Sequence, residues 1–314
     1  MSGRERFKRF LNREPTTRPA FVPMIRGLLS RIEGLPMETL TSDPTLWANS
    51  LMKTTQLFGF DGLVVGLDLT LMAEACGCRI AWREDRPLAM PLRGTLNEVP
   101  EACGRMKHAL ETARRLFETC RSGYACVAAL TGPVTLASQV FGGQEGAERV
   151  AEVKPVMVRV AEAFCTTRPD VLIFLEDTPL ALAGPTAAHR RIYNTLKNIA
   201  SHYDVSSALY LQGYRTDGLD GFAALNMDIY MLGPAENERF PPLNALRDLG
   251  KGAVGVGIGL PVNDVGKAME VIDEGLRLWR QGTGQGFFLT SAGPLTRDVD
   301  LGTLRALTDE ILRL

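Results

Sequence analysis

The sequence carries its sharpest chemical signal at Glu176 and Asp177, two adjacent carboxylates that directly follow the apolar run Val171–Leu175. Neighbouring residues at a strand end point in different directions, so we expect one carboxylate to face a site and the other to cap the next helix. A carboxyl group in an apolar pocket has a raised pKa and can donate a proton near neutral pH. The pair therefore predicts general acid chemistry, and which of the two faces inward stays open.

A third carboxylate, Asp68, interrupts the apolar stretch Val64–Leu71. A charge in such a setting is costly unless it is paired or functional, which makes Asp68 a candidate catalytic residue. The alternative is that Asp68 caps the following helix. Arg26 could bind a carboxylate or phosphate through its forked guanidinium, or it could pair with Asp68. Both alternatives remain open from the sequence.

Further polar side chains fall at the ends of other apolar runs, and we expect these to bind a substrate. They are Tyr210, Gln212, Tyr230 and Ser291. The histidines, in contrast, lie on or near helical segments, away from the run ends: His108, His189 and His202. No Ser-His-Asp arrangement, GxSxG, HExxH or P-loop pattern is present.

Eight short apolar runs alternate with segments of helical periodicity, and these elements would position the candidate side chains. Most of the runs are apolar throughout, as in parallel strands that are covered on both faces. The expected strands are Ala20–Met24, Leu63–Leu67, Ala125–Leu130, Val171–Leu175, Ala208–Leu211, Asp228–Met231, Ala253–Gly257 and Phe287–Thr290. The expected helices are Ala102–Cys120, Gly146–Cys165, Ala187–Ala200, Asn263–Arg280 with Asn263 as its cap, and one from about Asp300.

This alternation predicts an α/β fold, a single (β/α)8 TIM barrel domain over residues 1–314 with a short N-terminal helical extension. The connection Met72–Leu96 after the second strand contains two short apolar stretches around a polar turn, which predicts a small hairpin insertion. A doubly wound open sheet is the alternative, but Met24–Leu28 and Gly255–Gly259 do not match its glycine-rich phosphate loop. In a barrel, reactive groups gather at the C-terminal ends of the strands.

The composition is that of an ordinary globular protein, with 45% hydrophobic and 23% charged residues. The 35 basic and 36 acidic side chains nearly cancel, which argues against nucleic acid or an anionic membrane as a partner. No apolar run is long enough to span a bilayer, and no secretory signal is visible. Six scattered cysteines without CxxC spacing indicate reduced thiols. We therefore expect a cytoplasmic protein, with a homodimer as one option.

Several motifs resemble those of the uroporphyrinogen decarboxylase superfamily, which also contains cobalamin-dependent methyltransferases. The most specific is Leu130-Thr131-Gly132-Pro133-Val134-Thr135-Leu136-Ala137-Ser138-Gln139, similar to the family's GPfTLa signature. The others are Arg4-Glu5-Arg6-Phe7, Phe58-Gly59-Phe60-Asp61-Gly62, Ala73-Glu74-Ala75-Cys76-Gly77-Cys78, Leu175-Glu176-Asp177 and Ser291-Ala292-Gly293-Pro294. The resemblance covers most of the chain and implies a (β/α)8 barrel, in agreement with the count of apolar runs.

The departures from the family pattern bear on function. True uroporphyrinogen decarboxylases carry an RQAGR loop and a GHG turn, where this chain has Met24–Leu29 and Ser291-Ala292-Gly293. A site with one arginine is poorly built for a substrate with many carboxylates. The zinc methyltransferases place HxC and a further Cys where this chain has Tyr210-Leu211-Gln212 and the same Ser291 turn. A zinc site of that kind is therefore not expected, although zinc held by Glu176, Asp177 or Glu74 stays open.

The resemblance thus favours the cobalamin-dependent methyltransferase branch. It implies that the chain moves a methyl group between a small methylated donor, such as a methoxy compound, and a cobalamin carried by a partner corrinoid-binding protein. A strand-end carboxylate would act as the proton donor. Two alternatives remain: a tetrapyrrole decarboxylase, which the alignment of Asp68 with the family's strand-two aspartate favours, and a non-catalytic or repurposed binding barrel.

Overall fold

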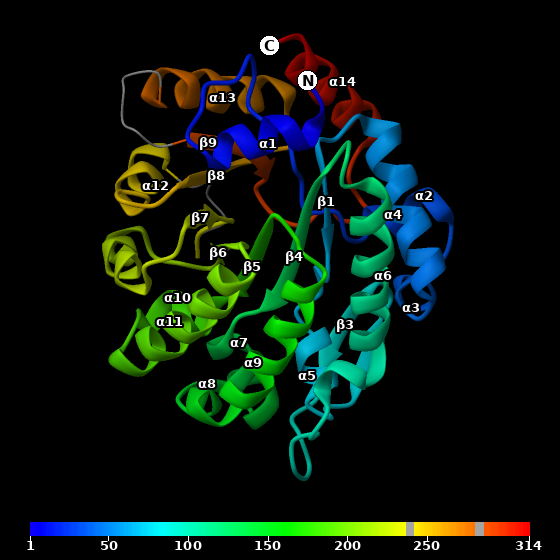
Figure 1. The fold of residues 1–314 in the computed structure, drawn as a ribbon, viewed down its shortest axis with the longest axis vertical. Coiled ribbons are helices and arrows are strands. Elements are labelled where there is room, and N and C mark those ends of the chain that lie inside the picture. The colour runs from blue at the N-terminus through cyan, green and yellow to red at the C-terminus, as the bar shows by residue number, and fades with distance from the viewer. Residues whose placement is uncertain (237–241, 280–285) are drawn as a thin grey trace.

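The computed structural model describes residues 1–236, 242–279 and 286–314. Within these residues, one curled sheet contains seven parallel strands in the order β1-β4-β5-β6-β7-β8-β9 (Figure 1). Apolar, fully buried strands of this kind form because both of their faces are covered. The strands are β1 (Gly62–Val65), β4 (Ala125–Thr131), β5 (Val171–Glu176), β6 (Ser206–Leu211), β7 (Ile229–Leu232), β8 (Gly255–Leu260) and β9 (Gly286–Ser291).

The first expected strand, Ala20–Met24, is not a regular strand. It forms isolated parallel bridges from Phe21 to Leu289 and from Ile25 to Leu295. Pro23 interrupts the ladder because it has no N–H to donate. Segment 20–25 still hydrogen bonds on both sides: Val22 N donates to the Leu289 carbonyl at 2.8 Å, and Asp61 N donates to the Phe21 carbonyl at 2.8 Å. It therefore occupies the eighth position of the ring, between β9 and β1, and confirms the expected barrel.

Helices connect successive strands and cover the outside of the sheet (Figure 1). The helix that was predicted to begin at Asn263 begins at Val265. The side chain of Asp264 accepts a hydrogen bond from Lys267 N at 3.0 Å, so Asp264 caps this helix in place of Asn263. No helix of the described chain is long and apolar enough to cross a bilayer. The helices are α1 (Gly3–Leu11), α2 (Leu28–Glu33), α3 (Met37–Thr41), α4 (Pro44–Phe58), α5 (Leu71–Ala75), α6 (Gly104–Cys120), α7 (Pro133–Phe141), α8 (Gly143–Ala147), α9 (Val150–Thr166), α10 (Thr178–Ala183), α11 (Ala187–His202), α12 (Leu243–Leu249), α13 (Val265–Trp279) and α14 (Leu301–Arg313), with 3-10 helices η1 (Pro100–Ala102) and η2 (Thr216–Leu225).

The predicted hairpin insertion is confirmed. Strands β2 (Ile80–Arg83) and β3 (Arg86–Ala89) pair antiparallel after the second position of the ring. The preceding strand β1 ends earlier than expected because Gly66 adopts φ 87° and turns the chain. A Cβ at Gly66 would lie 2.4 Å from the Ala129 carbonyl oxygen, so only glycine fits here. The turn directs the following residues toward the end of the barrel that the hairpin covers.

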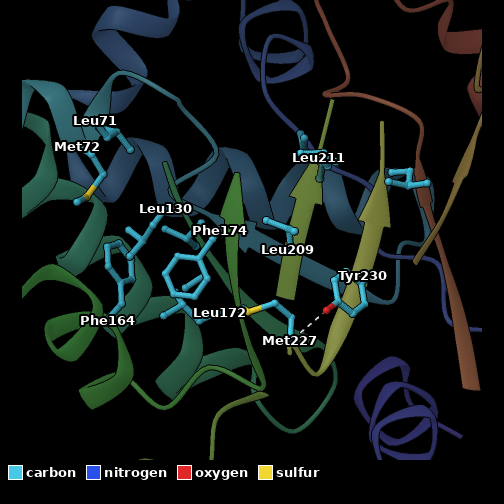
Figure 2. Packing of buried hydrophobic residues seen from close by; sticks show 14 of the residues in the cluster. Leu71, Met72, Leu130, Phe164, Leu172, Phe174, Leu209, Leu211, Met227 and Tyr230 are labelled. Atoms are coloured by element: carbon cyan, nitrogen blue, oxygen red, sulfur yellow. Dashed lines mark hydrogen bonds between the residues drawn. The ribbon is translucent and has the colours of Figure 1, made fainter. Parts of the chain in front are cut away.

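The buried side chains form two layers, one inside the barrel and one between the strands and the helices. Figure 2 shows part of the outer layer, in which Phe174 of β5 and Phe164 of α9 pack together with Leu130 and Leu172. Inside the barrel, the rings of Phe7 and Phe10 of α1 pack together, with their centroids 5.4 Å apart.

Both α1 phenylalanines also contact Phe288 of β9, with ring centroids 5.2 and 5.1 Å apart. Helix α1 lies across the N-terminal end of the strands (Figure 1). The aromatic cluster fills the barrel there, so a site inside the barrel must open at the other end.

Candidate active site

A cavity of about 450 Å³ lies at the C-terminal end of the barrel. Its walls come from the strand ends, with Met24, Leu67 and Leu175 as apolar surface and Arg26 among the polar groups. Residues 84–88 of the hairpin and, after β9, Pro294 and residues 296–298 form the rim. The volume is in the range of small-molecule sites.

Glu176 is the strand-end carboxylate that lines this cavity, and it is 1% exposed. Its Oε1 accepts hydrogen bonds from Val134 N at 3.0 Å and from the Tyr193 hydroxyl at 2.6 Å. Its Oε2 accepts from Thr135 N at 2.8 Å and from the Thr135 hydroxyl at 2.6 Å. Helix α7 therefore directs its first free N–H groups at the carboxyl group.

The local sequence explains this placement. Gly132 precedes α7, and a Cβ there would lie 2.3 Å from Cδ of Glu176, so the glycine makes room for the carboxyl group. Burial raises the pKa of Glu176 above its usual value, and the hydrogen bonds from Thr135, Tyr193 and the α7 N–H groups oppose that rise. The same environment holds the Tyr193 hydroxyl neutral, because burial and the neighbouring Glu176 charge both raise its pKa.

Asp177 takes a different position from its neighbour. It does not belong to the cavity lining, and its backbone N–H donates to the Thr135 hydroxyl at 2.8 Å. Since that hydroxyl accepts from Asp177, its own proton points to Glu176. The structure therefore places Glu176, and not Asp177, at the site.

Asp68 is buried and bound to the protein itself. One carboxylate oxygen accepts from Arg105 at 2.6 Å, and the other accepts from the backbone and hydroxyl of Thr70, each at 2.8 Å. Arg105 also binds Glu74 at 2.7 Å and lies 4.9 Å from the Trp82 ring of the hairpin. Asp68 thus ties β1 to α6 and the hairpin, and its ion-pair partner is Arg105.

The charge on Asp68 follows from these contacts. Burial alone would raise its pKa, but the guanidinium groups of Arg105 and Arg26 together hold the pKa below its usual value. Asp68 stays ionised near neutral pH and lies outside the cavity lining. This geometry suits a structural carboxylate better than a proton donor.

Arg26 lines the cavity and is half-buried. Its backbone N–H donates to the Leu295 carbonyl at 3.3 Å, which holds segment 20–25 beside the chain after β9. Among the residues that the structure describes, none forms an ion pair or a hydrogen bond with its guanidinium. The expected alternative of a direct Asp68–Arg26 pair is not realised.

Tyr210 and Gln212 both line the cavity and come from the end of β6. The Tyr210 hydroxyl lies 3.3 Å from Gln212 Oε1 and 3.3 Å from the Ala292 carbonyl oxygen, so it donates toward acceptors on this side. Burial raises the pKa of Tyr210 far above its usual value, and the phenol stays neutral. Gly233 makes room for it, because a Cβ there would lie 2.0 Å from the Tyr210 oxygen.

The structure does not bring Tyr230 into the cavity. Tyr230 points into the outer layer, where its hydroxyl accepts from Met227 N at 3.1 Å (Figure 2) and donates to the Phe222 carbonyl at 3.2 Å. Its neighbours on β7, Ile229 and Met231, face the barrel interior instead, as strand alternation requires.

Ser291 also lies outside the cavity lining. Its side-chain oxygen accepts from Met24 N at 3.0 Å and fastens segment 20–25 to β9. This contact supports the strand that carries Arg26. Ser291 therefore shapes the site through the backbone.

Sequence reasoning missed the residues that support Glu176. Tyr193 lies among the apolar positions of α11, and its helical spacing indicates only that it is on the buried face of the helix. Thr135 lies inside the quoted GPVTLA stretch, so its motif was visible although its contact was not. The rim residue Asp85 also went unnoticed; it accepts from Ser30 at 2.8 Å and from Met37 N at 3.0 Å.

Metal-ligating side chains do not gather at this site. In the described parts of the chain, no group of three or more His, Cys, Asp or Glu residues is arranged to hold a metal ion. At the positions where zinc-binding relatives carry His and Cys, Tyr210 and Gln212 face the cavity and Ser291 binds the Met24 backbone. These donors do not form a zinc ligand set.

Comparisons with known proteins agree with this architecture. A methyltransferase from Methanosarcina mazei has a similar structure, with a TM-score of 0.79 at 18% identity, covering 100% of this chain and 99% of that one. A B12-independent methionine synthase from Shewanella sp. W3-18-1, solved in complex with selenomethionine, has a TM-score of 0.64 at 15% identity, with 95% and 96% of the two chains covered. No curated protein matches the sequence.

The family model for uroporphyrinogen decarboxylase (URO-D) matches residues 2–166. This is just over half of the chain, and it includes α1, strands β1 to β4 with the hairpin, and the α7 signature. The chain belongs to the uroporphyrinogen decarboxylase (URO-D) family.

Proposed function

We propose that this protein is a methyltransferase that moves a methyl group from a small methylated donor, such as a methyl ether, to a corrinoid carried by a partner protein. The observation that carries the proposal is the cavity itself: it is small, largely apolar, and has Glu176, Tyr210 and Gln212 on one side. Similarity to a methyltransferase and to a methionine synthase in fold supports methyl transfer as the reaction class.

The size and charge of the cavity favour a small donor over a tetrapyrrole. A substrate with many carboxylates needs several cationic partners in the site. The cavity offers three arginines, of which Arg297 already pairs with Asp85 at 3.3 Å, and it also presents the acidic residues Glu84, Asp298 and Glu176. With at least as many acidic groups as arginines, the cavity is poorly suited to a porphyrinogen substrate with many carboxylates.

A corrinoid acceptor would remain on its partner protein and would meet the donor at the open end of the cavity. The reduced acceptor supplies the nucleophile that takes the methyl group. What the chain must supply is a bound, oriented donor and a proton for the leaving oxygen. A proton donor at this point contributes about 10²–10⁴-fold to the rate.

Glu176 is suited to deliver that proton. Burial favours its protonated form, and the Tyr193 hydroxyl can reverse direction to accept from it. After transfer, the N–H groups of Val134 and Thr135 stabilise the carboxylate that remains. The C–O bond of the ether breaks with its electron pair on oxygen, and the Glu176 proton neutralises that oxygen.

A non-catalytic binding barrel would need neither an open cavity nor a carboxyl group with a shifted pKa. The C-terminal end of such a barrel could be filled by side chains. The open cavity and the raised pKa of Glu176 both support an enzyme.

The test is methyl transfer from methoxy compounds to free cob(I)alamin, followed by the corrinoid absorption spectrum and by mass spectrometry of the demethylated product. Glu176→Gln should lower the rate about 10²–10⁴-fold. Glu162→Gln, the same change on the exposed surface of α9, should retain the wild-type rate. Circular dichroism confirms that both variants are folded. A folded Glu176→Gln variant with full activity would refute the proton-donor role, and absence of transfer from any methoxy donor would refute the function.

A further inference from the structure

A second cavity, of about 460 Å³, lies at the N-terminal end of the strands, beside α1. Its walls are the loops that lead into the neighbouring strands β4, β5 and β6, together with one face of α1. It shares no lining residue with the cavity at the C-terminal end or with the apolar side chains that fill the barrel. The proposed methyl transfer does not use this cavity, so its lining calls for a separate explanation.

The lining of this second cavity is cationic. Its four basic and two acidic side chains leave an excess of two positive charges when His202 is counted as neutral; they are Arg4, Lys8, Arg121, Arg168, Asp170 and Asp204. A phosphate monoester carries about 1.5 to 2 negative charges at pH 7, so it balances this excess. A carboxylate, with a single charge, would balance only half of it.

The fold itself uses part of this charge. Arg4 binds the buried Asp170 at 3.0 Å and donates to the Arg121 carbonyl at 3.1 Å. One terminal nitrogen of Arg121 donates to the Thr167 carbonyl at 3.0 Å. These contacts neutralise Asp170 and satisfy carbonyl groups just beyond the ends of α6 and α9, where cations are also favoured by the helix dipoles. They account for Arg4 and for one side of Arg121.

Two further cations have no such role. Neither Lys8 nor Arg168 forms an ion pair or a side-chain hydrogen bond with a residue that the structure describes. Both are exposed, so each remains hydrated until an anion reaches it. Arg121 is half-buried and keeps the N–H groups that Thr167 does not use. Three cations from three elements thus line one cavity, and the oxygens of a phosphate group can accept from all three.

Arg168 occupies a backbone position that favours glycine. Its φ is 55° in the turn between α9 and β5, where its N–H donates to the Cys165 carbonyl at 2.9 Å. A residue with a Cβ is strained in this left-handed region, whereas glycine is not. Glycine would therefore serve the turn at least as well, and the requirements of the fold do not explain the guanidinium.

The opposite side of the cavity determines how a ligand would lie. Asp204 precedes β6, two positions along the sheet from the strand that follows Arg121, and its charge repels a phosphate from that side. The rings of His202 and Tyr203 lie next to it, with centroids 5.1 Å apart, and offer flat surface to an uncharged group. The Tyr203 hydroxyl donates to Glu162, outside the lining, at 3.3 Å.

We propose that this cavity is a second ligand site that binds a phosphate monoester, with the phosphate held by Lys8, Arg121 and Arg168 and a flat, uncharged body against Tyr203. The excess of two positive charges matches one phosphate group, and Asp204 excludes a second one at the far side. The site is separate from the cavity that contains Glu176, and the proposal does not depend on which reaction takes place there.

Calorimetry on the full chain at constant ionic strength tests this assignment, with phenyl phosphate, benzoate and inorganic phosphate as probes. Phenyl phosphate should bind about tenfold more tightly than benzoate, which has the same ring but a smaller charge. It should bind about three- to tenfold more tightly than inorganic phosphate, which lacks the ring. Failure of phenyl phosphate to bind, or equal affinity for it and either of the other probes, would overturn the assignment.

Arg168→Gly places the binding in this cavity. The change removes the guanidinium where glycine suits the backbone, so it should weaken phenyl phosphate binding about tenfold without lowering the melting temperature. Lys8→Gln, on the exposed surface of α1, should weaken binding by a smaller factor.

Arg13→Gly is the matched control, because Arg13 also has a left-handed backbone, with φ 59°, and lies outside the cavity lining. It should bind phenyl phosphate as the wild type does. Wild-type affinity in Arg168→Gly, or an equal loss in Arg13→Gly, would refute the site. Because the measurement is binding alone, its outcome is distinguishable from success or failure of the methyl-transfer assay.

Discussion

The two ends of the barrel differ in how the arginines at them are paired. At the N-terminal end, Asp61 binds Arg6 and Arg18, each at 2.7 Å, and also accepts from Phe21 N at 2.8 Å. At the C-terminal end, Arg26 reaches the cavity and finds no ion-pair partner in the part of the chain that the structure describes. The N-terminal end binds Arg6 and Arg18 in buried ion pairs, whereas at the C-terminal end Arg26 forms no ion pair with a described residue.

The apolar packing of the two ends differs in the same way. Phe7, Phe10 and Phe288 fill the barrel at the N-terminal end, whereas the C-terminal end keeps a cavity of about 450 Å³. Filled space and paired charge stabilise the fold, while open space and unpaired charge are typical of binding sites. The difference separates residues that hold this protein together from residues that can act on a ligand.

The largest effect is expected at the closed end. Asp61→Ala would leave Arg6 and Arg18 buried without their carboxylate, and it should lower the free energy of unfolding by about 3–5 kcal/mol. Urea unfolding followed by circular dichroism measures this change. Asp85→Ala on the rim should lower the free energy of unfolding by a clearly smaller amount. A loss below about 1 kcal/mol for Asp61→Ala would show that the closed end is not held by this cluster.

A second effect concerns the support of Glu176. Tyr193→Phe removes the 2.6 Å hydrogen bond to Glu176 Oε1 and should lower the free energy of unfolding by about 1.5–3 kcal/mol if that carboxyl group is ionised. Tyr203→Phe serves as the control, because Tyr203 directly follows α11 and its hydroxyl donates to Glu162 of α9 at 3.3 Å, away from Glu176. A change no larger than that of the control would indicate that Glu176 is protonated in the resting protein.

The pH dependence follows from opposite shifts at two carboxyl groups. Because burial raises the pKa of Glu176, its protonated form contributes stability at low pH that is lost as the pH rises from the usual glutamate value through the raised pKa. The methyl-transfer rate should stay level below the raised pKa of Glu176 and fall by about tenfold per pH unit above it.

Asp68 behaves in the reverse sense. Its lowered pKa means that its ionised form contributes stability above the usual aspartate value, which is lost as the pH falls through the lowered pKa. Rate and melting profiles of the wild type, Glu176→Gln and Asp68→Asn separate the two groups. A rate that is flat or rises with pH in the wild type would contradict Glu176 as the proton donor.

The smallest effect is expected at the open end. Arg26→Gln removes a charge without breaking an ion pair, so the free energy of unfolding should change by less than about 1 kcal/mol. Arg105→Gln, which breaks the pair with Asp68, should cost about 3–5 kcal/mol under the same conditions. Equal losses for the two variants would remove the contrast between paired and unpaired arginines at this end.

Much of the architecture could be predicted because it depends on local periodicity. Seven of the eight apolar runs became strands within a few residues of their expected bounds, and the hairpin appeared within the Met72–Leu96 connection. Apolar runs of strand length and helical spacing are properties of short windows, so a single sequence contains them. The exception, Ala20–Met24, contains Pro23, whose missing N–H breaks the ladder even though the segment keeps its place.

The sequence located the candidate site, but it did not show which of the strand-end side chains face the cavity. The strand-end rule directed attention to Arg26, Glu176, Tyr210 and Gln212, and these residues all line one cavity. The rule could not distinguish Tyr230 from them, because the direction of a side chain depends on the register of its strand in the ring.

Partners of the charged groups were decided only by the tertiary structure. Asp68 pairs with Arg105 of α6, and Glu176 binds Tyr193 of α11 and the start of α7, all distant along the chain. The environment of Arg26 was decided in the same way, since only the folded chain shows that no carboxylate among the described residues forms an ion pair with it. Residue types and their spacing set which chemistry is available, whereas long-range packing sets which group is satisfied and which is left to bind a ligand.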